Sequence, residues 1–188
     1  MKKIAIVLLL IGGSLASQAQ QRVFTKSGKI MFDATSPSSP EKISAVNEKA
    51  YSVLDVSNGN LEFMLLMKAF SFEKALMQEH FNENYVESDK FPKATFKGAV
   101  SDFTSVNMQK DGDYNVKVDG KLTIHGVTKD VETAAVLTVR KGTVISAKSS
   151  FKIVLLDYDI KVPTLVKDKV ANEAKIDIDL LFEPVKVG

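Results

Sequence analysis

The side chains best suited to metal binding or acid–base chemistry are two histidines, His80 and His125, in a chain without cysteine. A protein-bound zinc ion needs several ligands at short spacings, such as His-x-His or His-x-x-x-His. Neither histidine has a partner at such a spacing, so the sequence predicts no metal site. We expect His125 to hydrogen-bond within its own turn, and His80 to pack on the inner face of a helix.

Nucleophilic catalysis has no better support in the sequence. An activated serine needs a base that is itself oriented, often beside a Gly-x-Ser-x-Gly turn. The serines lie in no such turn, and the chain has no glycine-rich phosphate loop. Asp157 and Asp159 resemble an acid–base pair, but they alternate with Lys161 as solvated side chains do. The residues therefore predict a protein that is not an enzyme and holds no cofactor.

The first 19 residues have the pattern of a secretory signal peptide. Two lysines precede the apolar run 4–11, and small residues lead to a cleavage point after Ala19. The run is too short to span a bilayer. The sequence predicts export to the periplasm or the cell exterior, no stable membrane span, and a single domain over residues 20–188.

Charge and cysteine content narrow the classes of partner. Removing residues 1–19 takes two lysines from the 25 basic residues, which leaves 23 against 23 acidic residues. A neutral chain has no excess charge to attract nucleic acid or an anionic surface. The absence of cysteine excludes disulfides and an acylated N-terminal cysteine, so no lipid anchor is predicted.

Most of the chain alternates apolar and polar residues, the period-2 pattern of β-strands. The pattern indicates about eight or nine strands joined by tight turns at Asn58-Gly59, His125-Gly126 and Lys141-Gly142, with a type I′ turn at the first. Gly120, inside one run, indicates a bend or a close approach by another group. In the run 143–155 the inward residues are Ile145, Ala147, Phe151, Ile153 and Leu155. The prediction is a mainly β fold, either an antiparallel barrel of about eight strands or a two-sheet sandwich, because periodicity does not distinguish them.

One segment breaks the β pattern. Met77, Phe81 and Tyr85 are spaced by four, as on one face of a helix. Ser71 is a suitable cap, and Glu73 would lie in the first turn. The spacing predicts one amphipathic helix over about residues 72–84, laid against a sheet or across a barrel mouth.

Two stretches carry a resemblance to a known family. One is Gly-Lys-Leu-Thr-Ile-His-Gly-Val-Thr-Lys at 120–129; the other holds His-Phe-Asn-Glu at 80–83 and Phe-Pro-Lys-Ala-Thr-Phe-Lys-Gly at 91–98. Their order and spacing resemble the YceI-like family of extracytoplasmic lipid-binding proteins. The resemblance implies a lipocalin-like barrel that holds a long isoprenoid or a similar lipid, and it favours the barrel over the sandwich. Many members carry an Asp-x-x-His-Ser-like element near the start of the domain, whereas residues 25–32 of this chain contain no histidine.

The function predicted from this resemblance is an exported, non-catalytic protein that holds a long apolar lipid for sequestration, transport or storage. Polar groups at the mouth, such as His125 and Lys129, would contact the lipid head. The candidate ligand-binding residues are Phe63, Leu65, Met67, Met77, Phe81, Leu122, Ile124, His125, Phe151 and Ile153. Two alternatives stay open: a structural or adhesive β domain with a filled core, and an enzyme acting on a hydrophobic substrate. A homodimer also stays open.

Overall fold

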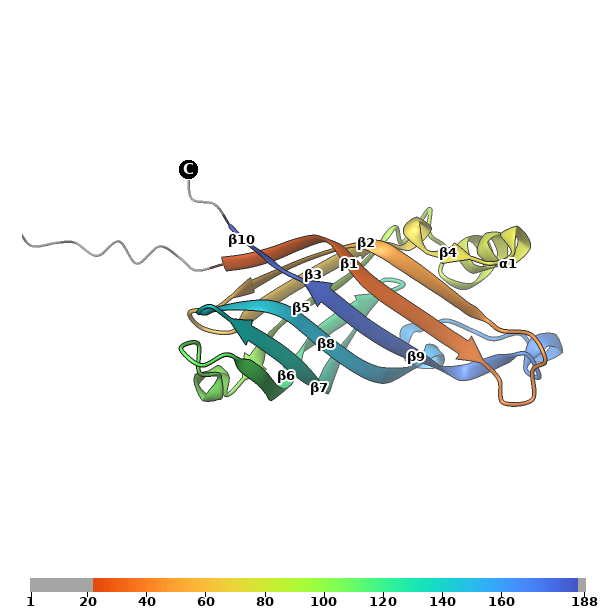
Figure 1. Cartoon of the computed structure of the whole chain (residues 1–188). Helices are drawn as coiled ribbons and strands as arrows, with labels where there is room; N and C mark the ends of the chain where they lie inside the picture. Colours follow the sequence, from red (N-terminus) through yellow and green to blue (C-terminus); the bar gives the residue numbers. More distant parts are fainter. Residues whose placement is uncertain (1–21, 186–188) are drawn as a thin grey trace, which may run out of the picture.

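The computed structural model describes residues 22–185, which form one antiparallel β-barrel (Figure 1). Eight long strands make its wall: β1 (Arg22–Thr35), β2 (Ser44–Asp55), β3 (Asn60–Leu66), β5 (Lys93–Ser101), β6 (Gly112–Ile124), β7 (Val127–Arg140), β8 (Thr143–Val154) and β9 (Val170–Leu181). Two very short strands are β4 (Ser71–Phe72) and β10 (Glu183–Pro184). The helical segments are η1 (Met67–Ala69), α1 (Ala75–His80), η2 (Phe81–Tyr85), η3 (Phe103–Ser105), η4 (Leu155–Tyr158) and η5 (Thr164–Val166).

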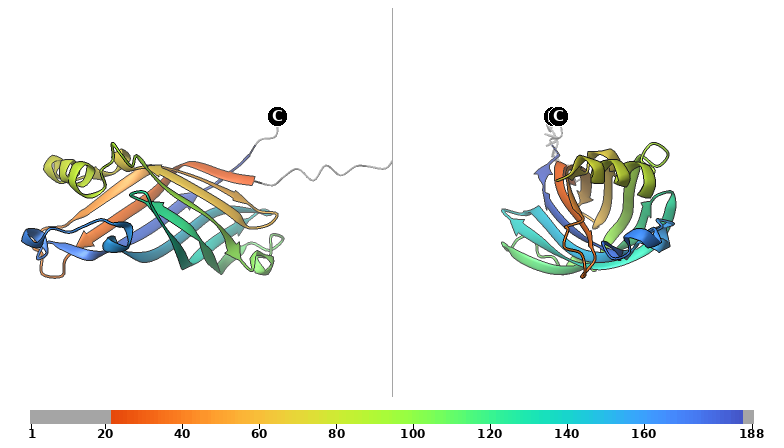
Figure 2. Two further views of the ribbon diagram at one scale, coloured as in Figure 1. Left: turned by 180° about the vertical axis from the view of Figure 1, so that it is seen from behind. Right: turned by 90° about the vertical axis from the view of Figure 1, so that its right-hand side faces the viewer.

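The wall closes because β1 pairs with both β2 and β9. Around the barrel the order is β1-β9-β8-β7-β6-β5-β3-β2, with every pair antiparallel. The view along the barrel in Figure 2 shows the strands curving around one axis. Closure gives each of the eight long strands a partner on both sides over at least part of its length, which limits pairing with other chains. The prediction of a mainly β, antiparallel barrel of about eight strands is confirmed, and the sandwich is excluded for the described residues.

The tight turns follow glycine, as expected. His125-Gly126 and Lys141-Gly142 are two-residue hairpin turns in which both residues have positive φ. At Asn58-Gly59 only the glycine has positive φ, and the Gly59 N–H donates to the Asp55 carbonyl at 2.8 Å. The hairpin is present, but its connection is longer than the type I′ turn that we expected.

Gly120 permits a close approach of two strands. It lies opposite Gly98 on β5, and a Cβ on Gly120 would lie 2.6 Å from the Gly98 Cα and 2.6 Å from the Phe96 ring. The ring of Phe96 therefore occupies the space that two side chains would otherwise fill on the inner face. The close approach predicted at Gly120 is confirmed.

Side chains alternate between the barrel interior and the solvent, with one shift of phase in β8. Thr138 pairs with Ser146, but Val139 pairs with Val144, so Ile145 is an extra residue in β8. This bulge buries Val144 and turns Ile145 outward, where 37% of its surface is exposed. The inward assignment of Ile145 was wrong, whereas Ala147, Phe151, Ile153 and Leu155 do face the interior.

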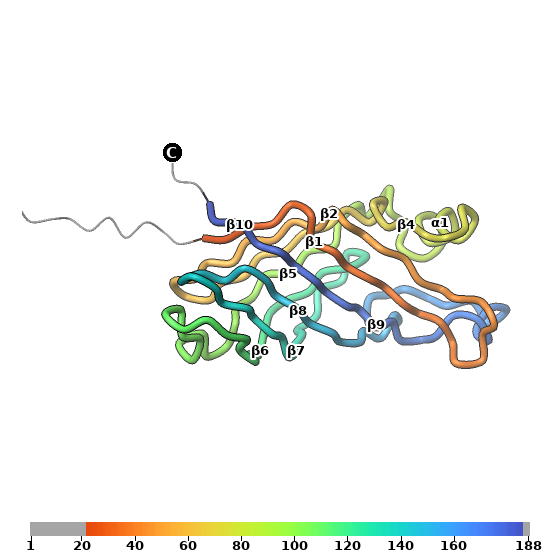
Figure 3. The backbone as a smooth tube through the Cα atoms, viewed as in Figure 1, coloured from red at the N-terminus to blue at the C-terminus, as the bar shows by residue number. Residues whose placement is uncertain are grey.

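The helical segment is shorter than predicted and begins later. α1 has six residues and η2 continues it as a π-helical turn of five residues, so the segment runs from 75 to 85. Ser71 does not cap it, because Ser71 and Phe72 pair as β4 with the start of β2. Backbone pairing with β2 thus takes the residues that the helix would have used. The segment lies at the same end of the barrel as η4 and η5 (Figure 3).

The predicted signal peptide, residues 1–19, lies outside the described residues. Within residues 22–185 no helix is long and apolar enough to cross a membrane.

Candidate ligand-binding cavity

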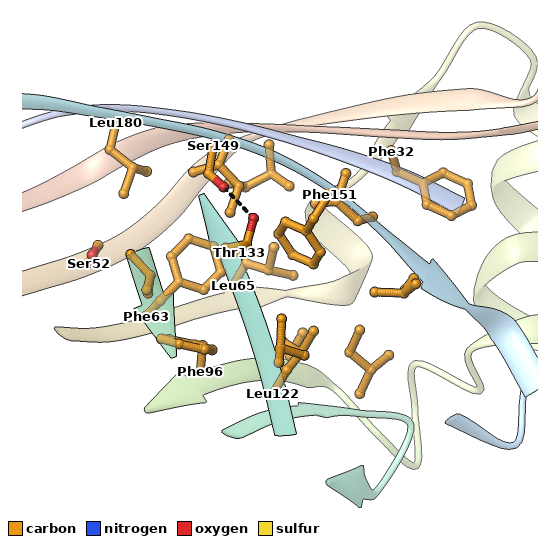
Figure 4. Close-up of a pocket in the computed structure, with 18 of the residues that line it drawn as sticks. Phe32, Ser52, Phe63, Leu65, Phe96, Leu122, Thr133, Ser149, Phe151 and Leu180 are labelled. Atoms are coloured by element: carbon orange, nitrogen blue, oxygen red, sulfur yellow. Dashed lines mark hydrogen bonds between the residues drawn. The ribbon is translucent and has the colours of Figure 1, made fainter. Parts of the chain in front are cut away.

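An apolar cavity of about 150 Å³ runs inside the barrel. Every long strand contributes to its wall because alternate side chains of each strand point inward. Figure 4 shows Phe63, Leu65, Phe96, Leu122 and Phe151 around the shared space. An engineered cavity of comparable size and lining is known to stay dry and to accept a small apolar molecule. The interior is therefore suited to hydrocarbon and unsuited to charge.

The few polar groups in the wall already have hydrogen-bond partners. The Ser52 hydroxyl donates to the Glu62 carbonyl at 3.1 Å, and the Ser149 hydroxyl donates to the Ala134 carbonyl at 2.7 Å. Lys148 touches the cavity with its stem only, since its ammonium group pairs with Asp179 at 2.9 Å among solvent-exposed side chains. No side chain of the described wall presents an unpaired charge to the interior. A polar ligand would find little to bind here.

A second, larger cavity of about 410 Å³ lies beneath the helical segment at one end of the barrel. Its apolar floor is bordered by polar groups that the inner cavity lacks: His80, Tyr85 and Lys169. Burial raises the pKa of Tyr85, and its protonated hydroxyl can donate a hydrogen bond. Glu41 and Lys74 pair with each other at the rim. We call this space the outer chamber.

An aromatic cluster separates the two cavities. The Phe81 ring centroid lies 5.0 Å from that of Phe72, 5.6 Å from that of Phe70 and 5.8 Å from that of Phe32. Phe32 and Phe81 line both cavities. A chain that extends from the interior into the outer chamber would pass beside these two rings and beside the other residues that line both cavities, Val86, Leu155 and Ile160.

Comparison with known proteins gives this barrel a family. The family model described as the YceI-like domain matches residues 14–182. The chain belongs to the YceI-like family. Among curated proteins, none is similar enough in sequence to count as a match.

Several solved structures share the fold at low sequence identity. A polyisoprenoid binding domain from Saccharophagus degradans, described as implicated in plant cell wall breakdown, is 13% identical, with a TM-score of 0.71 over 86% of this chain and 97% of that one. BcnA from Burkholderia cenocepacia is 17% identical, with a TM-score of 0.64 over 83% of this chain and 96% of that one. The YceI protein of Campylobacter jejuni is 17% identical, with a TM-score of 0.59 over 78% and 87%. At these identities the likeness concerns the fold.

The structure places eight of the ten candidate residues of this YceI-like barrel in the wall of the inner cavity. They are Phe63, Leu65, Met67, Phe81, Leu122, Ile124, Phe151 and Ile153. Met77 lines the outer chamber instead, because the helical segment lies across the end of the barrel. That these residues bind a ligand stays a prediction.

His125 lies outside both cavities. Its Nδ1 is 3.0 Å from the Tyr158 carbonyl oxygen and its Nε2 is 2.8 Å from a Glu87 carboxylate oxygen, so it bonds two distant segments rather than its own turn. The Phe91 ring packs against the imidazole, with centroids 4.6 Å apart. Both ring nitrogens are therefore engaged in holding the loops together. Lys129 is exposed on β7 and lines neither cavity.

His80 is solvent-exposed at the border of the outer chamber, so the expectation that it packs on the inner face of the helix was wrong. Asp157 and Asp159 are exposed as predicted, with Asp159 paired to Lys161 at 3.5 Å. In residues 22–185 no group of three or more His, Cys, Asp or Glu side chains is placed to hold a metal ion.

Sequence reasoning missed Phe32 and Phe96 as cavity residues. Both lie in phase with inward neighbours, Ile30 for Phe32 and Ala94 for Phe96, so alternation carried the signal. Phe70 and Phe72 gave no such signal, because a 3₁₀ turn precedes them and breaks the period.

Proposed function

We propose that this YceI-like protein binds a long apolar lipid of the isoprenoid type inside its barrel and keeps the tail away from water. The observation that carries the proposal is the continuous apolar wall, in which each polar group is already hydrogen-bonded. A tail removed from water gains about 25 cal/mol per Å² of apolar surface. The name of the Saccharophagus domain, a polyisoprenoid binding domain of the same fold, supports the isoprenoid class.

The two cavities suggest how such a lipid would lie. The inner cavity alone, about 150 Å³, is smaller than the ~300–1,000 Å³ of typical ligand pockets. A long chain would therefore extend past Phe32 and Phe81 into the outer chamber of about 410 Å³. Its polar end would lie near His80, Tyr85 and Lys169, where hydrogen-bond partners are available. In this arrangement the protein acts passively, by shielding the tail and orienting the head.

The first test is native mass spectrometry of the protein purified from its own host, followed by organic extraction. A stoichiometric long-chain lipid is the expected result, and its mass would identify the ligand. If the protein carries no lipid and also fails to bind added geranylgeraniol, the lipid-binding proposal is contradicted and the structural β domain is favoured.

A matched pair of variants adds a control to this test. Ala94 is buried and lines the inner cavity, whereas its neighbour Thr95 points outward from β5 and is exposed. Ala94→Phe should fill the cavity and abolish geranylgeraniol binding, and Thr95→Phe should leave binding unchanged. Equal binding by the two variants would contradict a ligand inside the barrel.

We propose further that the protein is exported and acts without catalysis. Support for export is the sequence pattern of residues 1–19 alone. Edman sequencing or mass spectrometry of the protein from its host should show an N-terminus at Gln20. An intact N-terminus on cytoplasmic protein would contradict export. Turnover of a bound lipid during incubation, seen as a change of its mass, would contradict the non-catalytic role.

A further inference from the structure

The seam between β7 and β8 is hydrogen-bonded over only part of its length. Pairing runs from the Lys141-Gly142 turn to Ala135 opposite Ser149 and then stops. Beyond this point residues 127–134 of β7 pair only with β6, and residues 150–154 of β8 pair only with β9. At ~3.3 Å per residue, the unpaired part of β7 is on the order of 25 Å long. We call this unpaired stretch the side slot.

The side slot opens onto the inner cavity. Val131 and Thr133 on β7, and Phe151 and Ile153 on β8, point inward from its two edges and line that cavity. On the outside, a groove of about 660 Å³ reaches the same place, since Ala135, Lys148 and Ser149 line both the groove and the cavity. Side chains at the last pairs of the β7–β8 seam are therefore reached both from the inner cavity and from the outer surface.

Side-chain hydrogen bonds connect β7 and β8 at the end of the side slot that adjoins the last strand pair, Ala135 opposite Ser149. Where the strand pairing stops, the Ala134 carbonyl accepts a hydrogen bond from the Ser149 hydroxyl at 2.7 Å. The Thr133 hydroxyl lies 3.2 Å from that of Ser149, as Figure 4 shows. The two hydroxyls therefore contact each other across the seam at its last strand pair. A small network of side-chain hydrogen bonds thus marks the point at which the two strands part.

The outer end of the side slot is closed by η4 and by His125. η4 follows β8 directly, and its Leu155 and Tyr158 side chains are buried. The His125 imidazole, at the tip of the β6–β7 hairpin, bonds the Tyr158 carbonyl and the Glu87 carboxylate. His125, Glu87 and Asp159 all have positive φ, a strained conformation for residues other than glycine. The His125 contacts and the buried side chains of η4 hold this closure without any strand pairing between η4 and β7, so it can be released without opening a β-ladder.

We infer that the apolar ligand enters and leaves the barrel sideways, through the side slot between β7 and β8, when η4 moves away from the hairpin tip. This route rests on the proposed lipid binding. Opening a paired seam would break a row of backbone hydrogen bonds. In the side slot there are no such backbone bonds to break. Val154 and Leu156, exposed by 39% and 66%, give its outer lip an apolar surface for a lipid tail.

A covalent bridge across the side slot tests the route, because a bridge stops sideways passage while leaving end-on threading possible. The chain has no cysteine, so a Glu132→Cys/Lys152→Cys variant carries only the introduced thiols. Both residues are exposed, and continuing the β7–β8 register places them opposite each other across the slot. A bis-maleimide whose spacer matches the distance between the two thiols can join them across the slot. The control is Lys121→Cys/Asp130→Cys, an exposed pair directly opposite in the fully paired β6–β7 seam.

Uptake and release of geranylgeraniol carrying a fluorophore on its hydroxyl are followed by stopped flow, with and without the bridge. The slot bridge should slow both rates at least tenfold with little change in their ratio, and the control bridge should change neither rate. Unchanged rates in the slot-bridged protein would overturn the sideways route while leaving lipid binding intact. If the unbridged protein takes up no probe, the proposed function fails, and the route fails with it.

Discussion

At the scale of single residues, two glycines set the shape of the inner wall. Gly98 and Gly120 face each other on β5 and β6, and the ring of Phe96 lies over both of them. Any side chain at Gly120 would meet the Lys97 carbonyl oxygen at 2.6 Å as well as the Gly98 Cα. Backbone atoms cannot give way as a flexible side chain can, so the contact requires glycine.

Gly120→Ala should therefore destabilise the barrel by about 2 kcal/mol or more, since over-packing of a well-packed site typically costs 1–3 kcal/mol. Chemical denaturation measures the change. Gly112→Ala in the same strand is the control, because its Cβ would approach no atom closer than 3.7 Å. Similar losses in the two variants would show that the cost comes from alanine in β6 rather than from the close approach.

Asp55, a buried carboxylate at the end of β2, makes stability depend on pH. Its hydrogen bond from the Ser57 hydroxyl, at 2.5 Å, and the nearby Arg22 hold its pKa below the usual value against the opposing effect of burial. A depressed folded-state pKa contributes stability above the unfolded-state pKa of ~3.9 and loses it as pH falls through the folded value.

Asp55→Asn should consequently lower stability at pH 7 by about 1–2 kcal/mol, with the deficit relative to the parent shrinking as pH falls below ~4. Thermal unfolding across a pH series provides the measurement. Asp113→Asn, at an exposed carboxylate 3.7 Å from Arg140, is the control and should change stability little. A deficit that stayed constant down to pH 2 would assign the effect to packing instead of charge.

At the scale of elements, the π-helical turn η2 positions the ring that divides the cavities. η2 begins at Phe81, and this ring contacts Phe32 from β1 and Phe72 from β4. π-turns are rare and are often found at functional sites. Here η2 follows α1, which lies over the outer chamber, and supplies Phe81, which also lines the inner cavity.

Phe81→Ala should widen the connection between the two cavities and shorten the residence time of bound geranylgeraniol, because Phe32 is then the one remaining ring among residues 22–185 that lines both cavities. It should also cost roughly 3–5 kcal/mol of stability, as expected for an aromatic truncation in a core. Competition kinetics and denaturation measure the two effects. Glu79→Ala, at an exposed position of α1, is the control for helix propensity. A residence time unaffected by loss of the ring would remove Phe81 as a barrier.

The side slot predicts an alternating pattern of hydrogen exchange along β7. Residues that flank a two-residue turn exchange both backbone bonds, so Lys129 and Val131 direct their N–H groups to β6. Asp130 and Glu132 then direct theirs towards the unpaired slot. Amide exchange followed by NMR should show these two far less protected than Lys129 and Val131. Equal protection at all four residues would mean that β8 or η4 covers the edge.

The strands were predictable from sequence because alternation and glycine turns are local signals. Local signals fail where a segment that is distant in sequence determines the secondary structure. Pairing with β2 turns Ser71 and Phe72 into β4 and delays the helix, and the bulge at Ile145 shifts the phase of β8 through its partner β7. The side slot between β7 and β8 had no sequence signal either, since apolar and polar residues alternate in the same way in the paired and unpaired parts of these strands.

At the scale of the whole molecule, the residues that line the inner cavity were more predictable than the contacts that close the ends of the barrel. Strand alternation was enough to find seven of the eight wall residues, because a barrel converts alternation into one shared interior, and helical spacing found Phe81. His125 was misplaced because its partners, Tyr158 and Glu87, are 33 and 38 residues away in sequence. The outer chamber was missed for the same reason, since it exists only where α1, η2 and the segment around Lys169 meet.

The division between an apolar interior and a polar rim makes a thermodynamic prediction for the complete protein. Binding of geranylgeraniol, an uncharged alcohol, should show a negative heat-capacity change from apolar burial. Its affinity should hardly change between about 0.05 and 0.5 M salt, because screening acts on charges. Geranylgeranyl phosphate should bind with a clear salt dependence if its head lies beside Lys169 and His80. Titration calorimetry with both ligands measures this difference. Since the tails are identical, a salt dependence for the alcohol would place charged groups next to the tail and contradict an apolar interior. Salt-independent binding of the phosphate would instead place the head away from the outer chamber.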